Sequence, residues 1–401
     1  MLSSIKMLKV SHFASKMCRF TGQIIREKCS SVGAINTFEK PKSKQYSFEY
    51  PPELRREHEE FMLLFPDVVN HLTEYAANNF KLMDAAKHFA NALEYDVPNG
   101  RKNRGLNAVI VYKDLIGKER QTSENIRQAQ ILGWCIELMV SSYFMADDII
   151  DCSKIRHNKP CWHTLNNVKS IAVNDVLMIE NGCYLLLKEF FGHFSCYPRM
   201  FELFQESTMN AYIGQSLDFQ IGNGDIAQFS NEKYICITNY KTAALLLYVP
   251  IALPMIFAGY ENEQMFEDIK NISNDAGHFY QVQNDYFDCF NDANVLRKPG
   301  TDIEDGRCTW LAVTAMEHVS DEQKDILIKC YGQNDAECIR QVKQVYKDLD
   351  LPKLYNQFAD QTHYNIKKKI EAFSQQYDLP PNIFLKTLNT LFADQMIYKS
   401  D

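Results

Sequence analysis

An aspartate cluster at the end of a long apolar segment is the first feature of this sequence with chemical potential. Asp147 and Asp148 are followed by two isoleucines and then Asp151. In a helix, positions i and i+4 lie on one face, so Asp147 and Asp151 project together. A hard divalent cation with oxygen ligands would relieve the repulsion between them. The alternative is an acidic helix end exposed to solvent.

A second stripe of oxygen-bearing side chains ends another apolar segment. Asn284, Asp288 and Asp292 follow one another at i, i+4 and i+8. Two such stripes are difficult to explain as solvated surface, and Mg²⁺ prefers a few carboxylates combined with water and phosphate oxygens. If the stripes face each other across a cavity, we expect two or three Mg²⁺ ions that grip a diphosphate. The predicted metal ligands are Asp147, Asp151, Asn284, Asp288 and Asp292.

Cationic residues near these stripes would complete a diphosphate site. They are Arg156, Lys241, Lys298 and Arg307. Arginine and lysine can stabilise a departing diphosphate, although each of them alone is more often a surface charge. The chain has no G-x-S-x-G, Walker or GxGxxG pattern. We therefore predict metal-assisted departure of a diphosphate, which leaves a carbocation that apolar and aromatic surroundings would stabilise.

Long helices are the elements expected to position these groups. From residue 50 onward, apolar residues recur at spacings of three and four, and glycine and proline together number only 29. We predict ten or more helices between residues 53 and 397, with loops near 95–104, 152–170, 221–230, 293–306 and 378–381. The uncharged run 243–260 is at the lower limit of a membrane span. Because Pro250 and Pro254 interrupt it, we expect a buried helix and no membrane span.

Charge divides the chain into two parts. Residues 1–50 carry a net charge of +6, and the rest carries −14. The acidic body argues against nucleic-acid binding, which depends on neutralising phosphates. The basic, serine-containing start is typical of an organelle-targeting peptide, so we predict a mitochondrial transit peptide over residues 1–45. An unstructured basic tail on a cytoplasmic protein is the alternative.

These motifs together resemble the isoprenyl diphosphate synthase family, and in particular its farnesyl-diphosphate-synthase-like members. The resemblance covers residues of about 50–395 and includes Asn103-Arg104-Gly105-Leu106, the first aspartate cluster, Gln215 with Asp218, Lys241-Thr242 after Tyr240, and Gly300-Thr301-Asp302. It implies an all-α isoprenoid synthase (class I terpenoid synthase) fold with helices around a central cavity. It also implies one domain over residues 46–401 and a homodimer.

The resemblance further implies roles for individual residues. Asp147, Asp148, Asp151, Arg156 and Lys241 would be catalytic. The substrate-binding set would be Arg156, Lys241, Thr242, Gln281, Lys298, Arg307, Gln215, Asp218 and Arg104, with Ser142 and Tyr143 shaping the hydrocarbon pocket. Ser142 lies where farnesyl-producing relatives often carry an aromatic residue, so a deeper cavity for a C15 substrate is expected.

The departures from the family pattern cluster at the expected site for isopentenyl diphosphate. Arg101 replaces a lysine, Val140 replaces a glutamine, His157 replaces the second of two arginines, and the C-terminal tail carries one cation. These changes favour a one-substrate enzyme. The leading hypothesis is a Mg²⁺-dependent terpene synthase, most like the insect enzymes derived from this family, that converts farnesyl diphosphate to a sesquiterpene. The alternatives are a chain-elongating isoprenyl (farnesyl or geranyl) diphosphate synthase and a non-catalytic partner subunit.

Overall fold

The computed structural model describes residues 52–80, 83–222, 224–290 and 300–396. They form the helices α2 (Pro52–Leu63), α3 (Phe65–Phe80), α4 (Met83–Asp96), α5 (Asn103–Ile116), α6 (Ser123–Ile150), α7 (Ala172–Phe191), α8 (Tyr197–Gly222), α9 (Asn231–Ile237), α10 (Val249–Phe257), α11 (Glu263–Phe290), α13 (Trp310–His318), α14 (Asp321–Cys330), α15 (Ala336–Asp348), α16 (Leu351–Tyr377) and α17 (Asn382–Met396). The predicted all-α isoprenoid synthase fold is confirmed, and so is the expectation of ten or more helices.

Short elements join these helices. The 3₁₀ turns are η1 (Lys118–Arg120), η2 (Trp162–Thr164), η3 (Lys169–Ile171) and η4 (Ile226–Gln228), and the strands are β1 (Ile155–Arg156) and β2 (Lys159–Pro160). A π-helix, η5 (Thr238–Tyr248), joins α9 to α10. The predicted transit peptide and the C-terminal tail lie outside the described residues.

Helix α6 runs through the middle of the core. Trp134 is fully buried, its ring stacks on Phe61 of α2 with 4.6 Å between ring centroids, and its Nε1 donates to Phe61 O at 3.1 Å. Helix α5 crosses α6 at Gly105 and Gly133, where neither helix carries a side chain. A capping box between Thr122 and Asn125 fixes the start of α6, whose 28 residues end at Ile150. That end is the first aspartate cluster.

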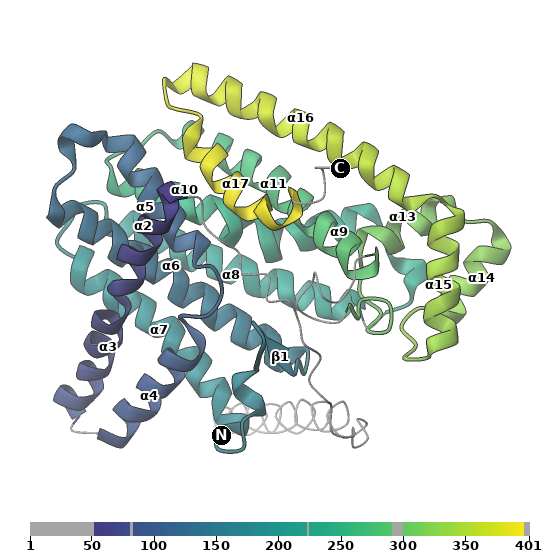
Figure 1. The fold of residues 1–401 in the computed structure, drawn as a ribbon, viewed down its shortest axis with the longest axis horizontal. Coiled ribbons are helices and arrows are strands. Elements are labelled where there is room, and N and C mark those ends of the chain that lie inside the picture. Colours follow the sequence, from purple (N-terminus) through teal and green to yellow (C-terminus); the bar gives the residue numbers. More distant parts are fainter. Residues whose placement is uncertain (1–51, 81–82, 223, 291–299, 397–401) are drawn as a thin grey trace, which may run out of the picture.

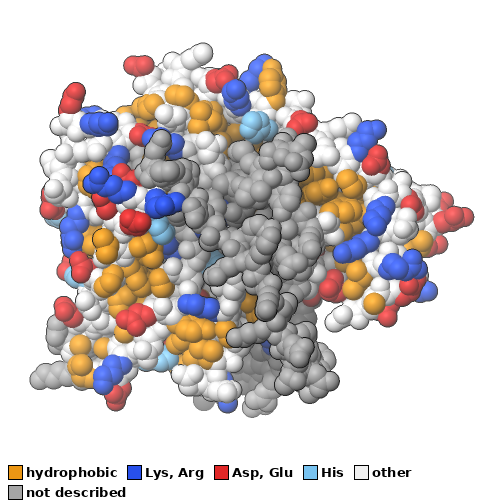
Figure 2. Space-filling view, in the orientation of Figure 1, with side chains coloured by type: hydrophobic (Ala, Val, Ile, Leu, Met, Phe, Trp, Pro, Cys, Tyr) orange, Lys and Arg blue, Asp and Glu red, His pale blue; other side chains and the backbone are white. Residues whose placement is uncertain are grey.

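The outer helices close the molecule around this core. Figure 1 shows the long helix α16 along one edge of the molecule, with α14 and α15 at its far end and α17 turned back toward α11. Helix α17 packs on α5, where Thr390 O accepts from Asn103 Nδ2 at 3.0 Å and Thr390 Oγ1 accepts from Asn107 Nδ2. On the face drawn in Figure 2, acidic and basic side chains are interspersed over the described surface.

The predicted loop at 152–170 contains a hairpin that sequence periodicity did not indicate. Strands β1 and β2 are only two residues each and pair antiparallel, with Arg156 opposite Lys159. The two residues between them, His157 and Asn158, both have positive φ. That combination is typical of a type I′ turn, which matches the twist of the flanking strands. Because a two-residue strand has no visible alternation, the pattern could not reveal it.

Three helical segments are long and apolar enough to cross a membrane by length and composition alone. They are Ser123–Ile150, Lys169–Phe191 and Asn231–Phe257, and 83%, 44% and 67% of their most apolar windows are buried inside the protein. Most of the uncharged run at 243–260 lies in the last of them, which begins twelve residues before the run and ends at Phe257. The middle segment, which contains α7, is the most exposed of the three.

Candidate active site

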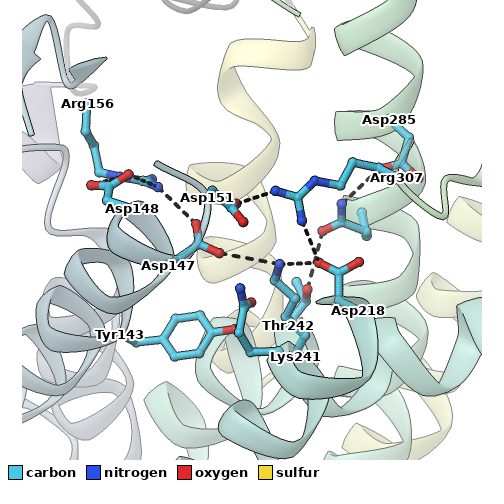
Figure 3. Close-up of polar contacts among 12 residues, drawn as sticks. Tyr143, Asp147, Asp148, Asp151, Arg156, Asp218, Lys241, Thr242, Asp285 and Arg307 are labelled. Carbon is cyan, nitrogen blue, oxygen red and sulfur yellow. Dashed lines mark hydrogen bonds and ion pairs between the residues drawn. The ribbon is translucent and has the colours of Figure 1, made fainter. Parts of the chain in front are cut away.

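Five segments of the chain bring charged side chains to one place. The end of α6 supplies Asp147, Asp148 and Asp151, the hairpin supplies Arg156, and α8 supplies Asp218. The π-helix supplies Lys241, and Arg307 precedes α13. Figure 3 shows these side chains converging from opposite sides. Acidic groups at the C-terminal end of α6 oppose the helix dipole, so this cluster requires cations nearby.

The charges alternate along a continuous chain of contacts. Arg156 Nε donates to Asp148 Oδ2 at 2.8 Å, and its Nη2 donates to Asp147 Oδ2 at 3.1 Å. Lys241 Nζ lies 3.5 Å from Asp147 Oδ1 and 2.6 Å from Asp218 Oδ2. The chain ends at Arg307, which lies 3.5 Å from Asp218 Oδ2 and 2.6 Å from Asp151 Oδ2. Four carboxylates thus share three cations.

Burial makes these contacts electrostatically strong. The pKa of Lys241 is raised, because the charges of Asp147 and Asp218 outweigh the burial that would lower it. Conversely, Lys241, Arg156 and Arg307 outweigh burial at Asp147 and hold the pKa of that carboxyl below its ordinary value. Burial and the Asp147 charge raise the pKa of Asp151. Lys241 therefore stays charged at neutral pH and is held between two carboxylates.

A second set of polar contacts connects the π-helix to α11. Thr242 Oγ1 donates to Gln281 Oε1 at 3.3 Å, and Gln281 Nε2 donates to Asp285 Oδ1 at 2.8 Å. Asp285 Oδ2 accepts from Tyr234 OH at 2.6 Å and from Trp310 N at 2.8 Å. Burial raises the pKa of Asp285 to about 6 despite these hydrogen bonds. Thr242 and Gln281 were both predicted to bind substrate, and the structure brings them into contact.

The second predicted metal stripe is only partly within the described residues. Asn284 and Asp288 lie one turn apart near the end of α11, and Asp288 Oδ2 accepts from the backbone N–H of Asp302 at 3.0 Å. The backbone of Gly300 packs directly on Asp288 O, where a Cβ would lie 2.0 Å away. Asp292 and Lys298 lie outside the described residues.

The donor set at the first cluster is compatible with a divalent cation. Asp147 Oδ1 is buried and accepts no hydrogen bond from the described residues, and the four carboxylates exceed the three cations by one charge. Among the described residues, no group of three or more His, Cys, Asp or Glu side chains is arranged to hold a metal ion. The carboxylate oxygens of the first cluster are nevertheless the ligand type that Mg²⁺ prefers.

Tyr143 and Gln215 lie next to the ionic chain. Tyr143 OH donates to Gln215 Oε1 at 3.2 Å, while Gln215 Nε2 is buried and has no hydrogen-bond partner among the described residues. Burial raises the pKa of Tyr143, so its hydroxyl stays neutral. Ser142 is also buried, and its hydroxyl donates to Met139 O of the same helix at 2.7 Å.

Arg104 lies at a separate cationic corner. Its guanidinium is 5.3 Å from the centroid of the Phe144 ring, and Arg156 lies 5.0 Å from the same ring centroid. Arg104 Nε is buried without a hydrogen bond among the described residues, and burial lowers the pKa of this guanidinium. Nearby, Arg101 Nη1 donates to Thr390 O at 3.4 Å, and Lys102 Nζ lies 3.2 Å from Glu137 Oε2.

Comparisons with known proteins identify the family of this chain. A family model described as polyprenyl synthetase matches residues 86–349. The chain belongs to the polyprenyl synthetase family. It is 36% identical to farnesyl pyrophosphate synthase of Murgantia histrionica over 83% of this chain and 81% of that one. It is 33% identical to the Gallus gallus farnesyl pyrophosphate synthase over 91% of this chain and 99% of that one. The Homo sapiens protein of the same name is 36% identical over 82% and 79%.

Membership of the polyprenyl synthetase family makes the chain an enzyme of the prenyltransferase type. It also shows that the terpene synthase hypothesis is wrong, because the relatives at 33–36% identity are farnesyl pyrophosphate synthases. The hypothesis treated each departure from the pattern as a lost contact. In the structure, Arg101, Lys102 and Arg104 all lie at the start of α5, so this corner keeps its cationic side chains. His157 lies in the tight turn that directly follows Arg156, where its φ is positive.

Sequence reasoning missed several residues that the structure gives a clear place. Asp285 lies inside the second predicted cluster but was not selected, because it faces away from the Asn284 stripe. Tyr234 and Phe144 had no motif of their own. Gly214 and Gly277 lie four residues before Asp218 and Gln281. An isolated glycine inside a helical pattern often marks close packing, so that signal was present.

Asp96, at the end of α4, is expected to make the free energy of unfolding depend on pH. Burial raises the pKa of Asp96 to about 6. A raised pKa means that the folded protein binds this proton more tightly than the unfolded chain. The resulting stability is complete below about pH 4 and is lost as the pH rises through about 6.

Replacing Asp96 with asparagine is expected to remove this cost. From the shift of about two pKa units, Asp96→Asn should raise the free energy of unfolding at pH 8 by roughly 2–3 kcal/mol, and by less at pH 5. Urea denaturation at the two pH values measures the difference. The control is Asp325→Asn on the exposed surface of α14, which should change little at either pH. An equal effect of Asp96→Asn at both pH values would contradict the argument.

Proposed function

We propose that this protein is a chain-elongating prenyl diphosphate synthase that joins an allylic prenyl diphosphate to isopentenyl diphosphate. The observation that carries the proposal is the alternating chain of Asp148, Arg156, Asp147, Lys241, Asp218, Arg307 and Asp151. This chain of contacts brings three cations and four carboxylates together at one half-buried site. The relatives are farnesyl pyrophosphate synthases, which supports a C15 product.

The residues of this chain stabilise negative charge on the leaving group. When the allylic C–O bond breaks, both electrons stay with the diphosphate, and the allylic carbon becomes a carbocation. The isopentenyl double bond then attacks that carbon, and the new cation loses a proton to restore a double bond. Arg156, Lys241 and Arg307 are held in position by carboxylates, so they can meet the departing charge without reorganisation.

We propose that two or three Mg²⁺ ions bind Asp147, Asp151, Asn284, Asp288 and Asp292. Bound Mg²⁺ would neutralise the carboxylates and polarise the diphosphate as a Lewis acid. Asp147 Oδ1 supports this assignment at the first cluster, because its nearest cation is the Lys241 ammonium at 3.5 Å and it accepts no hydrogen bond from the described residues.

A second diphosphate fits the corner at Arg104. The Nε of Arg104 is buried and has no hydrogen-bond acceptor among the described residues, and leaving such a donor unsatisfied is costly. A diphosphate oxygen would supply the acceptor. Phe144, which both Arg104 and Arg156 contact, separates this corner from the ionic chain.

Product analysis by mass spectrometry tests the function directly. Purified protein with Mg²⁺ receives isopentenyl diphosphate together with dimethylallyl or geranyl diphosphate. We expect farnesyl diphosphate as product and complete loss of turnover with EDTA, restored by excess Mg²⁺. A parallel reaction receives farnesyl diphosphate alone. Hydrocarbon from that reaction, with no elongation in the first, would overturn the proposal.

We propose that the protein is a homodimer formed through an apolar face on α7 and α8. Val173 and Leu177 of α7 are each 53% exposed, and Met209 and Ile213 of α8 are 61% and 49% exposed. Each pair follows i, i+4, so each helix presents two apolar side chains on one face. Exposed apolar groups of this kind typically mark an interface.

Substituting a charge into this face should separate the subunits. For Leu177→Glu and Met209→Glu, we expect a change from dimer to monomer by size-exclusion chromatography with light scattering, since a buried unpaired charge is costly. The matched control is Ile328→Glu on α14, which is 45% exposed and lies elsewhere. A wild-type monomer, or a variant dimer as stable as the wild type, would contradict the proposed interface.

We also propose that residues 1–45 direct the protein to mitochondria and that residues 46–401 form one domain. The net positive charge of the first 50 residues and their serine content support the targeting role. Fusing residues 1–45 to a fluorescent protein should give mitochondrial fluorescence. Uniform cytoplasmic fluorescence would favour the alternative localisation.

A further inference from the structure

The π-helix η5 lies in close contact with two helices at glycine residues. An ideal Cβ at Gly214 of α8 would lie 2.2 Å from the backbone nitrogen of Lys241. An ideal Cβ at Gly277 of α11 would lie 2.5 Å from Cα of Ala243. Both distances are far shorter than a carbon atom allows. The backbone of η5 therefore occupies space that only glycine leaves open on either side.

Each glycine is followed, one helical turn later, by a polar residue that bonds to the same stretch of η5. On α8, Asp218 follows Gly214 by four residues and accepts from Lys241 Nζ at 2.6 Å. On α11, Gln281 follows Gly277 by four residues and accepts from Thr242 Oγ1 at 3.3 Å. Positions i and i+4 share a helix face. The backbone contact and the side-chain contact are thus made by the same face of each helix.

The length of η5 and the two helical glycines beside it both indicate that close backbone packing is required here. π-Helices mostly occur as single turns at functional sites, whereas η5 extends over 11 residues. Glycine inside a helix costs about 0.5–1 kcal/mol relative to alanine. The cost of a glycine on each of α8 and α11, which both pack on η5, is explained if close approach is required there. The backbone at Lys241, not only its side chain, is then fixed relative to Asp218.

We propose that Gly214 and Gly277 are positioning residues that hold the π-helix where Lys241 can meet the diphosphate. The inference rests on the proposed function for the role of Lys241 in turnover. The effect of the glycines on where the Lys241 ammonium group lies is independent of the proposed function. Because the contact is backbone to backbone, an added methyl group must separate the helices and withdraw Lys241 from Asp147 and Asp218.

Alanine substitution tests the proposal. For Gly214→Ala and Gly277→Ala, we expect kcat/KM to fall about 10- to 100-fold, because a displacement near 1 Å can cost 10²-fold. Affinity for inorganic pyrophosphate with Mg²⁺, measured by calorimetry, should fall at least fivefold. The control is Gly182→Ala on α7, where the Cβ would meet side chains and no backbone, with Leu72 Cδ1 at 3.2 Å and Phe89 Cζ at 3.6 Å. It should stay within twofold of wild type.

A double-mutant cycle separates positioning from general destabilisation. If Gly214 acts through Lys241, Gly214→Ala should add little to the loss caused by Lys241→Met. The comparison is Gly133→Ala at the α5–α6 crossing, where the Cβ would lie 2.7 Å from Gly105 O. Gly133 is also packed against backbone but lies away from Lys241, so the loss caused by Gly133→Ala should multiply with the loss caused by Lys241→Met. Multiplying losses for Gly214→Ala, or unchanged pyrophosphate affinity, would overturn the proposal.

The variant Ala243→Gly tests the same contact if the alanine variants do not fold. It loosens that contact without adding bulk and should lower pyrophosphate affinity two- to fivefold. Unchanged affinity in that variant would then count against the proposal. If the wild type makes no prenyl product but the glycine variants still lose pyrophosphate affinity, the proposed function fails while the positioning role stands.

Discussion

Replacing Lys241 with methionine is expected to lower kcat/KM for the allylic substrate by about 10²- to 10³-fold. Removing one preorganised group that stabilises developing negative charge typically costs this much. Lys241 is the only described cation that contacts both Asp147 and Asp218. Its loss also leaves these two carboxylates without the charge between them. Steady-state kinetics with saturating isopentenyl diphosphate measures the effect, and circular dichroism checks that the helices remain.

The matched control for this variant is Lys369→Met on α16. Lys369 also pairs with an aspartate, Asp275, but their side chains are 50% and 35% exposed. Exposed pairs contribute at most about 1 kcal/mol, so turnover should stay within twofold of wild type. If Lys241→Met also retained turnover within twofold, the site would not lie at this ionic chain.

Replacing Glu137 with alanine is expected to lower the free energy of unfolding by about 3–5 kcal/mol, since this leaves a buried charge without its partner. Glu137 is 2% exposed and lies 3.2 Å from Lys102 Nζ, which is itself buried. Its Oε1 also accepts from the backbone N–H of Gly105 at 2.7 Å. The substitution therefore leaves an ammonium and an amide group unsatisfied in the core. Urea denaturation provides the measurement.

Two further variants show whether this effect comes from the unpaired charge. The double variant Glu137→Met with Lys102→Met removes both charges and should recover at least half of the lost stability. Glu60→Ala breaks the exposed pair with Arg56 on α2 and should leave the free energy of unfolding almost unchanged. A double variant less stable than Glu137→Ala alone would contradict the explanation.

The helical fold was predictable because its determinants are local. Apolar spacing, few breakers and terminal signals such as Thr122 with Asn125 act within one or two turns of chain. The same locality revealed the pairing of Asp147 with Asp151. Family resemblance then supplied the order of the remaining motifs. The small hairpin at Arg156 escaped because its strands are two residues long.

The error about chemistry arose where distant residues had to be combined. Val140, His157 and Arg101 were each compared with a pattern, position by position. Whether a substitution removes a binding contact depends on which cations remain nearby in space. The structure brings Arg101, Lys102 and Arg104 to the start of α5, with α17 beside it. The residue types alone could not show which cations lie next to each substituted position.

The sequence by itself determined the helices, the two carboxylate stripes and the family to which the chain belongs. Those features depend on residue type and on spacing within a helix. Only the tertiary structure decided that Lys241 lies between Asp147 and Asp218, which are 94 and 23 residues away in the chain. It also decided that η5 is a π-helix held against Gly214 and Gly277. The physical reason is that charge pairing and backbone contact act through space, whereas periodicity reports only neighbours along one helix.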